Sequence, residues 1–275
     1  MGIDPISCIE PEAPCVTGVG IIIAMRVEAR CITPLRLFFN QRTDLGNGAA
    51  IWLCGVGAEA AGAAATGLRT AGATALMSFG FAGALHSGLN SGGLMLPESI
   101  HTGDCLLPVD LDWRARLQRC LPDHLSVTGG ILAASSKVLT STSAKRDLAE
   151  STGAKAVDME SGAVAEVATN AGLPFMAVRA ISDPLDFSPP GVLLEAVRPD
   201  GSPRLVRLLG LLLKRSLTLG TLLRLASDAR AARSTLSTVV RYADAEMRAI
   251  RSPASSPGGC IARQQAVGSD RSGGV

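Results

Sequence analysis

Aromatic side chains are scarce in this sequence: they make up 3% of its 275 residues, although hydrophobic residues together make up 47%. The core must therefore be aliphatic, built from Ala, Leu, Val and Ile. An excess of charge of one sign is also lacking, because 26 basic and 24 acidic residues leave a formal net charge of +2. A general nucleic-acid binder would be strongly basic, so we expect no nucleic-acid partner.

Cysteine pairs with metal-binding spacing are absent too. The seven cysteines are scattered singly, without a Cys-x-x-Cys pair, which indicates reduced thiols in a cytoplasmic protein and predicts no metal site. No uncharged apolar stretch reaches the ~18 residues that a membrane span needs. The first residues lack the basic start and long apolar run of a secretory signal. We therefore expect a cytoplasmic protein.

Continuous apolar runs alternate with helix-forming segments along residues 19–181. Runs of β-branched character indicate buried strands, and their alternation with helices predicts a single α/β domain with a central mixed sheet flanked by helices. The predicted strands are 19–25, 49–54, 74–79, 105–109, 127–133, 155–159 and 174–181. The predicted helices are 58–71, 161–171, and 144–151 with Ser143 as its N-cap and its end near Gly153.

Composition divides the chain into four segments. Residues 1–17 hold three prolines and are predicted to be a flexible leader, and residues 18–200 form the α/β domain. Residues 201–250 form a basic, Leu-rich helical extension that begins at Ser202-Pro203, a good N-cap and first helical position. Residues 251–275, rich in Ser, Gly, Pro and charge, are predicted to be a disordered tail.

Two acidic residues follow predicted strands, where ligands of such sheets bind. Asp183 ends the run Arg179–Asp183 and could simply cap a following helix. Among apolar neighbours, however, its carboxyl would have a raised pKa, and a neutral acid could protonate a leaving purine. Glu28 lies three residues past the strand 19–25 and could instead be an exposed Glu in a first helical turn.

Two further segments offer weaker signals. Glu160 joins a strand to a small-residue helix, where its carboxylate could accept ribose hydroxyls or simply suit the helix dipole. Met159 beside it could be an apolar platform for sugar or base, or plain core filling. Gly80–Gly83 is predicted to be a glycine-rich loop after the strand 74–79, which could hold an anion, a ribose or nothing.

Taken together, five segments resemble the purine and uridine phosphorylase superfamily in order and spacing, and within it the methylthioadenosine/S-adenosylhomocysteine nucleosidases. The resemblance extends over residues 19–185. The five segments are Ala24-Met25-x-x-Glu28, Cys54-Gly55-Val56-Gly57, Gly80-Phe81-Ala82-Gly83, Val157-Asp158-Met159-Glu160-Ser161 and Arg179-Ala180-Ile181-Ser182-Asp183.

The resemblance implies cleavage of the N-glycosidic bond of a purine nucleoside, by a homo-oligomer that needs no cofactor. It implies that Asp183 protonates the purine N7 and that Ser182 helps to place it. Glu28 would activate the attacking water. Glu160 would bind the ribose hydroxyls, with Met159 packing against the sugar. The other residues implied to contact the substrate are Gly80, Phe81, Gly83 and Val138.

Three positions depart from the nucleosidase pattern. Phe81 stands where these enzymes usually carry Ser, so a polar contact is lost and the pocket is more apolar. Asp158 replaces a Glu in the sugar-binding segment. Val138, in the region after Ser135-Ser136 that would face the base, stands where an aromatic stacking residue is usual.

The residues favour water over phosphate as the nucleophile. Phosphorylases of the superfamily hold phosphate with arginines, one of them just before the glycine segment, and that position here is Ser78. Their Gly-Asp-Pro-x-x-Arg segment near the first strand is missing, and Glu28 stands there instead. A carboxylate would repel phosphate but could activate water. Arg26 or Arg30 could still supply a phosphate site.

The C-terminal third resembles a narrower group, the hopanoid-associated phosphorylases. The implied substrate is adenosylhopane, an intermediate of hopanoid side-chain biosynthesis from which adenine is removed. One alternative is a soluble nucleoside such as methylthioadenosine, S-adenosylhomocysteine or futalosine. Another is a non-catalytic nucleoside or lipid carrier. The resembling segments are 208–213, 222–226 and 228–233.

The same third predicts peripheral contact with the inner face of the membrane. The segment 204–233 holds seven basic residues against one acid, Asp228, and leucines fill most positions between the first five of them. This composition suits an anionic lipid interface. A core-covering helix or a subunit interface are the alternatives. The basic residues are Arg204, Arg207, Lys214, Arg215, Arg224, Arg230 and Arg233.

Overall fold

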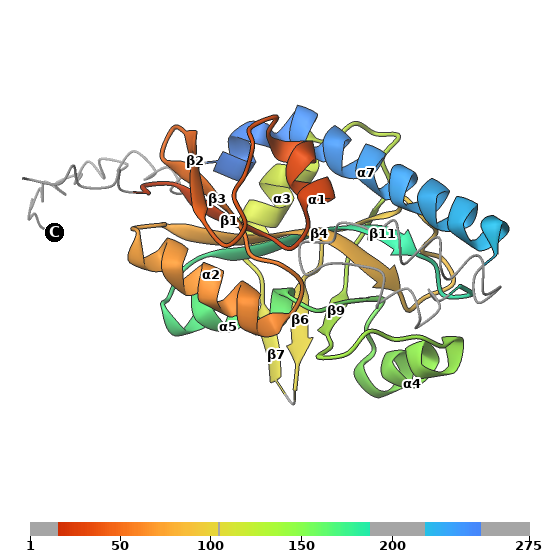
Figure 1. Cartoon of the computed structure of the whole chain (residues 1–275). Coiled ribbons are helices and arrows are strands. Elements are labelled where there is room, and N and C mark those ends of the chain that lie inside the picture. Colours follow the sequence, from red (N-terminus) through yellow and green to blue (C-terminus); the bar gives the residue numbers. More distant parts are fainter. Residues whose placement is uncertain (1–15, 104, 188–217, 249–275) are drawn as a thin grey trace, which may run out of the picture.

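The computed structural model describes residues 16–103, 105–187 and 218–248, in which strands form one mixed sheet with helices on both faces (Figure 1). The predicted fold class is therefore confirmed. Residues 1–15 of the predicted leader, 188–200 of the predicted domain, 201–217 and 249–250 of the predicted extension, and the whole predicted tail lie outside the described residues. The strands are β1 (Val19–Ile23), β2 (Arg42–Gly46), β3 (Ala49–Leu53), β4 (Ala75–Ala84), β5 (Leu94–Met95), β6 (Ser99–Thr102), β7 (Cys105–Pro108), β8 (Val127–Thr128), β9 (Ile131–Ala134), β10 (Ala156–Asp158) and β11 (Phe175–Asp183). The helices are α1 (Arg26–Ile32), α2 (Ala58–Thr70), α3 (Leu111–Cys120), α4 (Thr142–Thr152), α5 (Ser161–Asn170) and α7 (Leu219–Arg248).

Strand β4 is the centre of the sheet. It lies between β1 and β11, both parallel to it, and the sheet order continues from β1 through β3 to β2. The last residues of β4 also pair with β10, which runs antiparallel to it. Because of this direction, the residues that follow β10 lie beside the middle of β4 and not beyond its end. As a result, segments far apart in the sequence all reach the second half of one strand.

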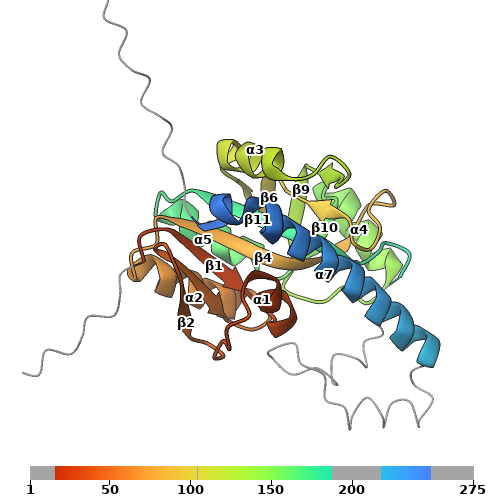
Figure 2. The same cartoon turned by 90° about the horizontal axis from the view of Figure 1, so that it is seen from above.

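The helices cover the sheet in two layers that pack on separate aliphatic clusters. On one face α2 and α5 bury alanines and aliphatic side chains, among them Leu68 and Val164. On the other face lie α1, α3 and α7, as both views show (Figures 1 and 2). The core is thus built mainly from aliphatic side chains, as the composition predicts. The fully buried Trp113 of α3 is an exception, and its indole N–H donates to the carbonyl oxygen of Glu246 at 2.7 Å.

Three sequence predictions need correction. Gly80–Gly83 is not a loop, because β4 continues to Ala84 and stays paired with β11 through this segment. The predicted strand 127–133 is two strands, β8 and β9, separated at Gly130, whose φ of +103° leaves the extended region. The N-cap of α4 is Ser141 rather than Ser143, since the Ser141 hydroxyl accepts the N–H of Ala144 at 3.2 Å. The predicted end of α4 at Gly153 is confirmed.

Helix α7 has two halves with different surroundings. Its C-terminal half covers the sheet, but apart from Ala232 the buried residues of this half lie beyond the segment 204–233 for which membrane contact is predicted. The other half is more open, and Leu219 and Leu223 are 65% and 63% exposed. No helix among the described residues is long and apolar enough to cross a membrane. The buried side chains of α7 include Ala232, Leu236, Val239, Ala243 and Met247.

The packing of α7 predicts different effects for two leucines of the same helix. Leu236 is fully buried, so Leu236→Ala removes apolar contacts and leaves a cavity, which should lower the free energy of unfolding by about 2–5 kcal/mol. The control Leu223→Ala should change it by less than about 0.5 kcal/mol. Urea denaturation of the full chain measures both. Equal effects would show that α7 does not belong to the folded core.

Candidate active site

A cavity of about 310 Å³ opens at the second half of β4 and gathers most of the predicted site residues. Gly80 is the exception, because it lies behind Glu28 and not on the cavity wall. Residues that the sequence did not single out also line the cavity, notably Lys137, Leu139 and Lys145. The predicted residues on its wall are Glu28, Phe81, Gly83, Val138, Met159, Glu160, Ser182 and Asp183.

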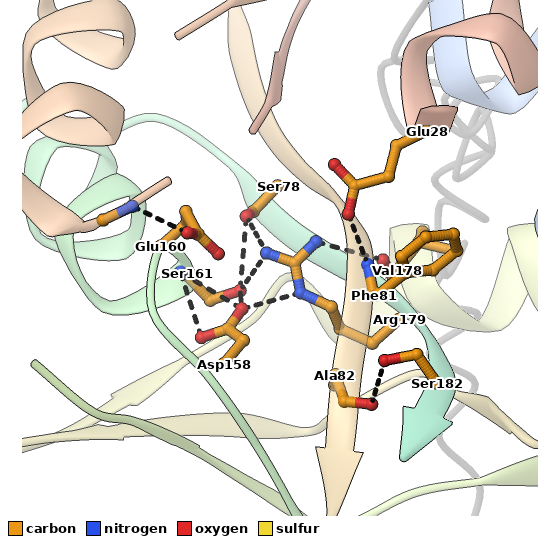
Figure 3. Close-up of polar contacts among 11 residues, drawn as sticks. Glu28, Ser78, Phe81, Ala82, Asp158, Glu160, Ser161, Val178, Arg179 and Ser182 are labelled. Carbon is orange, nitrogen blue, oxygen red and sulfur yellow. Dashed lines mark hydrogen bonds and ion pairs between the residues drawn. The ribbon is translucent and has the colours of Figure 1, made fainter. Parts of the chain in front are cut away.

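Glu28 lies in the first turn of α1 but is only 2% exposed, so the interpretation as an exposed Glu is wrong. Its two carboxylate oxygens accept different backbone N–H groups. Oε2 accepts the N–H of Met25 at 2.8 Å. Oε1 accepts the N–H of Phe81 in β4 at 2.8 Å (Figure 3). Burial raises the pKa of Glu28 to about 7, although Arg179 nearby favours the charged form. The carboxyl can therefore both gain and lose a proton near neutral pH.

The glycines at 80 and 83 make room for carboxyl groups of the protein itself. A Cβ added at Gly80 would lie 2.5 Å from Oε1 of Glu28, and one at Gly83 would lie 2.8 Å from Oδ2 of Asp183. Any larger residue would displace these side chains. The glycine segment is therefore part of a strand against which the two carboxyl groups pack directly.

Arg179 connects the polar groups beneath the cavity. Its side chain is 2% exposed, and Nε donates to Oδ2 of Asp158 at 2.6 Å. Nη2 donates to the hydroxyl oxygens of Ser78 at 2.6 Å and Ser161 at 3.0 Å (Figure 3). Although burial disfavours its charge, Asp158, Glu160 and Glu28 together raise the pKa of Arg179. Arg179 is thus a permanent buried cation.

Glu160 is held by the turn that leads into α2. Its Oε1 accepts the N–H of Gly57 at 2.8 Å, and Gly57 has a φ of +111°, a conformation that favours glycine. Burial and the neighbouring Asp158 raise the pKa of Glu160, while Arg179 opposes them. Asp158 has a different role from Glu160: its carboxylate accepts the N–H and hydroxyl of Ser161 as well as Arg179.

Asp183 ends β11 at a local irregularity in its pairing with β4, where Ser182 has no partner in the register. Residues 184–187 form a turn and not a helix, so Asp183 caps no helix in this part of the chain. Its Oδ1 lies 3.1 Å from the hydroxyl of Ser182, and its Oδ2 lies 2.8 Å from Nζ of Lys145. Burial raises the pKa of Asp183 despite the opposing charge of Lys145.

Arg26 and Arg30 do not line the cavity that contains Glu28. They line a second one of about 190 Å³, together with Arg36, and a guanidinium N–H of Arg26 donates to the carbonyl oxygen of Leu37 at 2.9 Å. No arginine is found among the described residues that line the first cavity. In residues 16–103, 105–187 and 218–248, no three His, Cys, Asp or Glu side chains are grouped as metal ligands.

Sequence reasoning missed the two buried cations of this site, Arg179 and Lys145. Arg179 stands inside an otherwise apolar strand, and a charge there needs a buried partner, so the sequence held a signal for it. Lys145 held none, because it lies in a polar helix between Ala144 and Arg146 and resembles any solvent-exposed lysine. Only its position in the fold shows that its side chain is 1% exposed.

The sequence profile of the phosphorylase superfamily matches residues 18–209. The chain belongs to the phosphorylase superfamily. As a member it is an enzyme that cleaves a glycosidic bond. No curated protein matches it in a sequence search.

Solved structures of nucleosidases share the superfamily fold of this chain. The 5'-methylthioadenosine/S-adenosyl homocysteine nucleosidase of Helicobacter pylori is 18% identical, with a TM-score of 0.58 over 82% of this chain and 99% of that one. Futalosine hydrolase of Helicobacter pylori is also 18% identical, with a TM-score of 0.58 over 82% of this chain and 98% of that one. The 5'-methylthioadenosine/S-adenosylhomocysteine nucleosidase of Neisseria meningitidis is 18% identical, with a TM-score of 0.60 over 83% of this chain and 97% of that one. At this identity the similarity shows the fold.

The raised pKa of Glu28 predicts how its contribution to stability depends on pH. Between its ordinary value of 4.5 and the folded value of about 7, the unfolded chain loses the proton that the folded chain keeps. Stability therefore falls as pH rises through this window and levels off above it, by about 3 kcal/mol in total. Glu28→Gln stays neutral and should escape this loss.

The measurement is the difference in unfolding free energy between Glu28→Gln and the wild type, obtained by urea denaturation from pH 4.5 to 8. Contributions of other groups cancel to first order in this difference. The variant should gain relative to the wild type as pH rises. A difference that is constant over the range would mean that Glu28 titrates at its ordinary pKa.

Proposed function

We propose that this enzyme hydrolyses the N-glycosidic bond of a purine nucleoside and releases adenine. The observation that carries the proposal is the gathering of the Glu28, Glu160 and Asp183 carboxyl groups around one largely apolar cavity of about 310 Å³. Such a volume lies at the lower end of the range for small-molecule sites. Three acids of different surroundings can divide the roles of acid, base and sugar ligand.

Asp183 is proposed as the general acid. A purine leaves poorly as an anion, so a proton delivered to ring N7 lowers the barrier while the electron pair of the breaking C1'–N9 bond moves to the base. The raised pKa of Asp183 favours the protonated form that this step requires. The Ser182 hydroxyl, 3.1 Å from Oδ1, helps to place the carboxyl.

Glu28 is proposed as the general base and Glu160 as the sugar ligand. With a pKa of about 7, Glu28 can remove a proton from the water whose oxygen bonds to C1'. Glu160 accepts the ribose hydroxyls, and Met159 and Val138 line the same cavity as apolar contacts for sugar and base. Holding the sugar in this way also places C1' relative to the acid and the base.

Water is the proposed nucleophile, because the surroundings of Glu28 do not favour phosphate. Ser78, at the position of a phosphate-binding arginine in phosphorylases, instead accepts a hydrogen bond from Arg179. Arg26 and Arg30 line the other cavity. A phosphate dianion would therefore meet the carboxyl groups of Glu28 and Glu160. Among the described residues, the cations on the cavity wall are Lys137 and Lys145, and Lys145 is already bonded to Asp183.

Adenosylhopane is the proposed substrate, with methylthioadenosine, S-adenosylhomocysteine and futalosine as alternatives. The C-terminal resemblance supports it, and so does an apolar wall with Val56, Phe81 and Leu139. A substrate held in the bilayer would require the peripheral membrane contact that the basic residues predict. Of these residues, Arg204, Arg207, Lys214 and Arg215 lie outside the described chain. Arg224 forms ion pairs with Asp186 and Asp228.

Replacing the proposed acid should nearly abolish base release. An amide cannot deliver the proton, so Asp183→Asn should lower kcat/KM for adenine release by ~10²–10⁴-fold. The matched control Asp186→Asn changes an acid that is 77% exposed in the adjacent turn and should leave the rate unchanged. Circular dichroism checks that both variants fold. Activity of Asp183→Asn within threefold of the wild type would refute the assignment.

The choice of nucleophile and substrate predicts the products. Mass spectrometry after incubation with adenosylhopane, and separately with methylthioadenosine, should show free adenine and a ribosyl product without phosphate, whether or not phosphate is added. Adenosylhopane should be cleaved with the higher kcat/KM. A ribosyl 1-phosphate whenever phosphate is present would show phosphorolysis. Cleavage of methylthioadenosine alone would favour a soluble substrate.

A further inference from the structure

Lys145 is a buried lysine on a helix whose other side chains are largely solvent-accessible. It is the one fully buried residue of α4, with a side chain 1% exposed, and its neighbour Arg146 is exposed. Burying an ammonium group costs several kcal/mol unless its hydrogen-bonding capacity is satisfied. The position therefore requires acceptors that are matched to the three N–H bonds of the ammonium group.

Those acceptors all come from one short segment of the chain, Asp183–Phe187. Nζ of Lys145 lies 2.8 Å from Oδ2 of Asp183, 2.9 Å from the carbonyl oxygen of Pro184 and 3.0 Å from that of Phe187. A fourth contact, to the carbonyl oxygen of Asp183, is longer at 3.5 Å. Three short bonds use the three donors. The ammonium thus binds both the carboxyl of Asp183 and the turn that follows it.

This arrangement distinguishes the two oxygens of Asp183. Oδ2 is bound to Lys145, whereas Oδ1 accepts, among the described residues, only the hydroxyl of Ser182 at 3.1 Å. Lys145 approaches from α4, whose first turn follows the Val138–Leu139 part of the cavity wall. One side chain therefore links the element next to the base-facing wall with the strand end that carries the acid.

We propose that Lys145 is a positioning residue for the proposed general acid: its ammonium fixes Oδ2 of Asp183 and the 183–187 turn, so that Oδ1 delivers the proton to the purine. The proposal rests on the role of Asp183 given above. Lys145 donates no proton to the substrate itself. Its bonds keep the carboxyl from rotating and hold the turn in place during the reaction.

The same ion pair also affects the protonation of the acid. The charged groups that face Asp183 are Lys145 from α4 and Asp228 from α7, while Glu28, Lys137, Asp158 and Glu160 lie on the wall of the same cavity. Lys145 favours the ionised form of Asp183, whereas burial and Asp228 favour the protonated form. Removal of Lys145 should therefore raise the pKa of Asp183 and move the pH of maximal activity upward.

The test replaces the charge while keeping the length of the side chain. Lys145→Met should lower kcat/KM for adenine release by ~10-fold or more at its optimum, because the acid is no longer held in place. It should also move the pH optimum to higher pH. Lys145→Arg keeps the charge and should restore the wild-type optimum. Arg146→Met, on the exposed side of the same helix, is the matched control and should behave as the wild type.

The result separates this proposal from the proposed function. If Asp183→Asn is inactive and Lys145→Met loses rate with a shifted optimum, both hold. If Asp183→Asn is inactive but Lys145→Met keeps its rate and optimum, only the role of Lys145 is refuted. An equal loss at every pH, with an unmoved optimum, would show that Lys145 supports the fold alone. An active Asp183→Asn refutes the proposed function itself.

Discussion

Two buried cations and four carboxyl groups meet at the second half of β4, and the arrangement of the site follows from how these charges are compensated. Arg179 binds Asp158 and Lys145 binds Asp183, so each cation has one close partner. Glu28 and Glu160 have backbone N–H donors instead of a cation of their own. Burial raises the pKa of each because a charged group loses its hydration there, Asp158 raises that of Glu160 further, and Arg179 opposes the shift in both.

The backbone is shaped to bring these groups together. Glycines at 80 and 83 leave the space that the carboxyl groups of Glu28 and Asp183 occupy, and Gly57 adopts the conformation that presents its N–H to Glu160. The irregular pairing at Ser182 lets β11 end with both Ser182 and Asp183 on the cavity wall. Glycines and irregular pairing weaken an ordinary strand. Here they are explained by the carboxyl groups that they position.

Much of this architecture could be predicted from the sequence, because apolar runs and helix signals reveal strands and helices locally. The strands around Ile21, Ile51 and Val178 were predicted to within two residues at each end. Contacts between distant segments could not be predicted in the same way. That Gly80 belongs to a strand depends on pairing with β11, and the burial of Lys145 depends on where the turn after Asp183 lies.

The excess of acidic groups gives a physical reason for the proposed reaction. Two buried cations and the exposed Lys137 face four carboxyl groups, so the carboxyl groups outnumber the cations unless protons remain bound. A nucleoside carries no positive charge in its ground state, but its sugar becomes oxocarbenium-like, and therefore positively charged, as the C1'–N9 bond breaks. Glu28 and Glu160 would then interact more strongly with the transition state than with the substrate, which is the condition for catalysis. An added arginine that held phosphate would weaken this negative field, so the same charge imbalance that favours the oxocarbenium-like sugar favours water as the nucleophile.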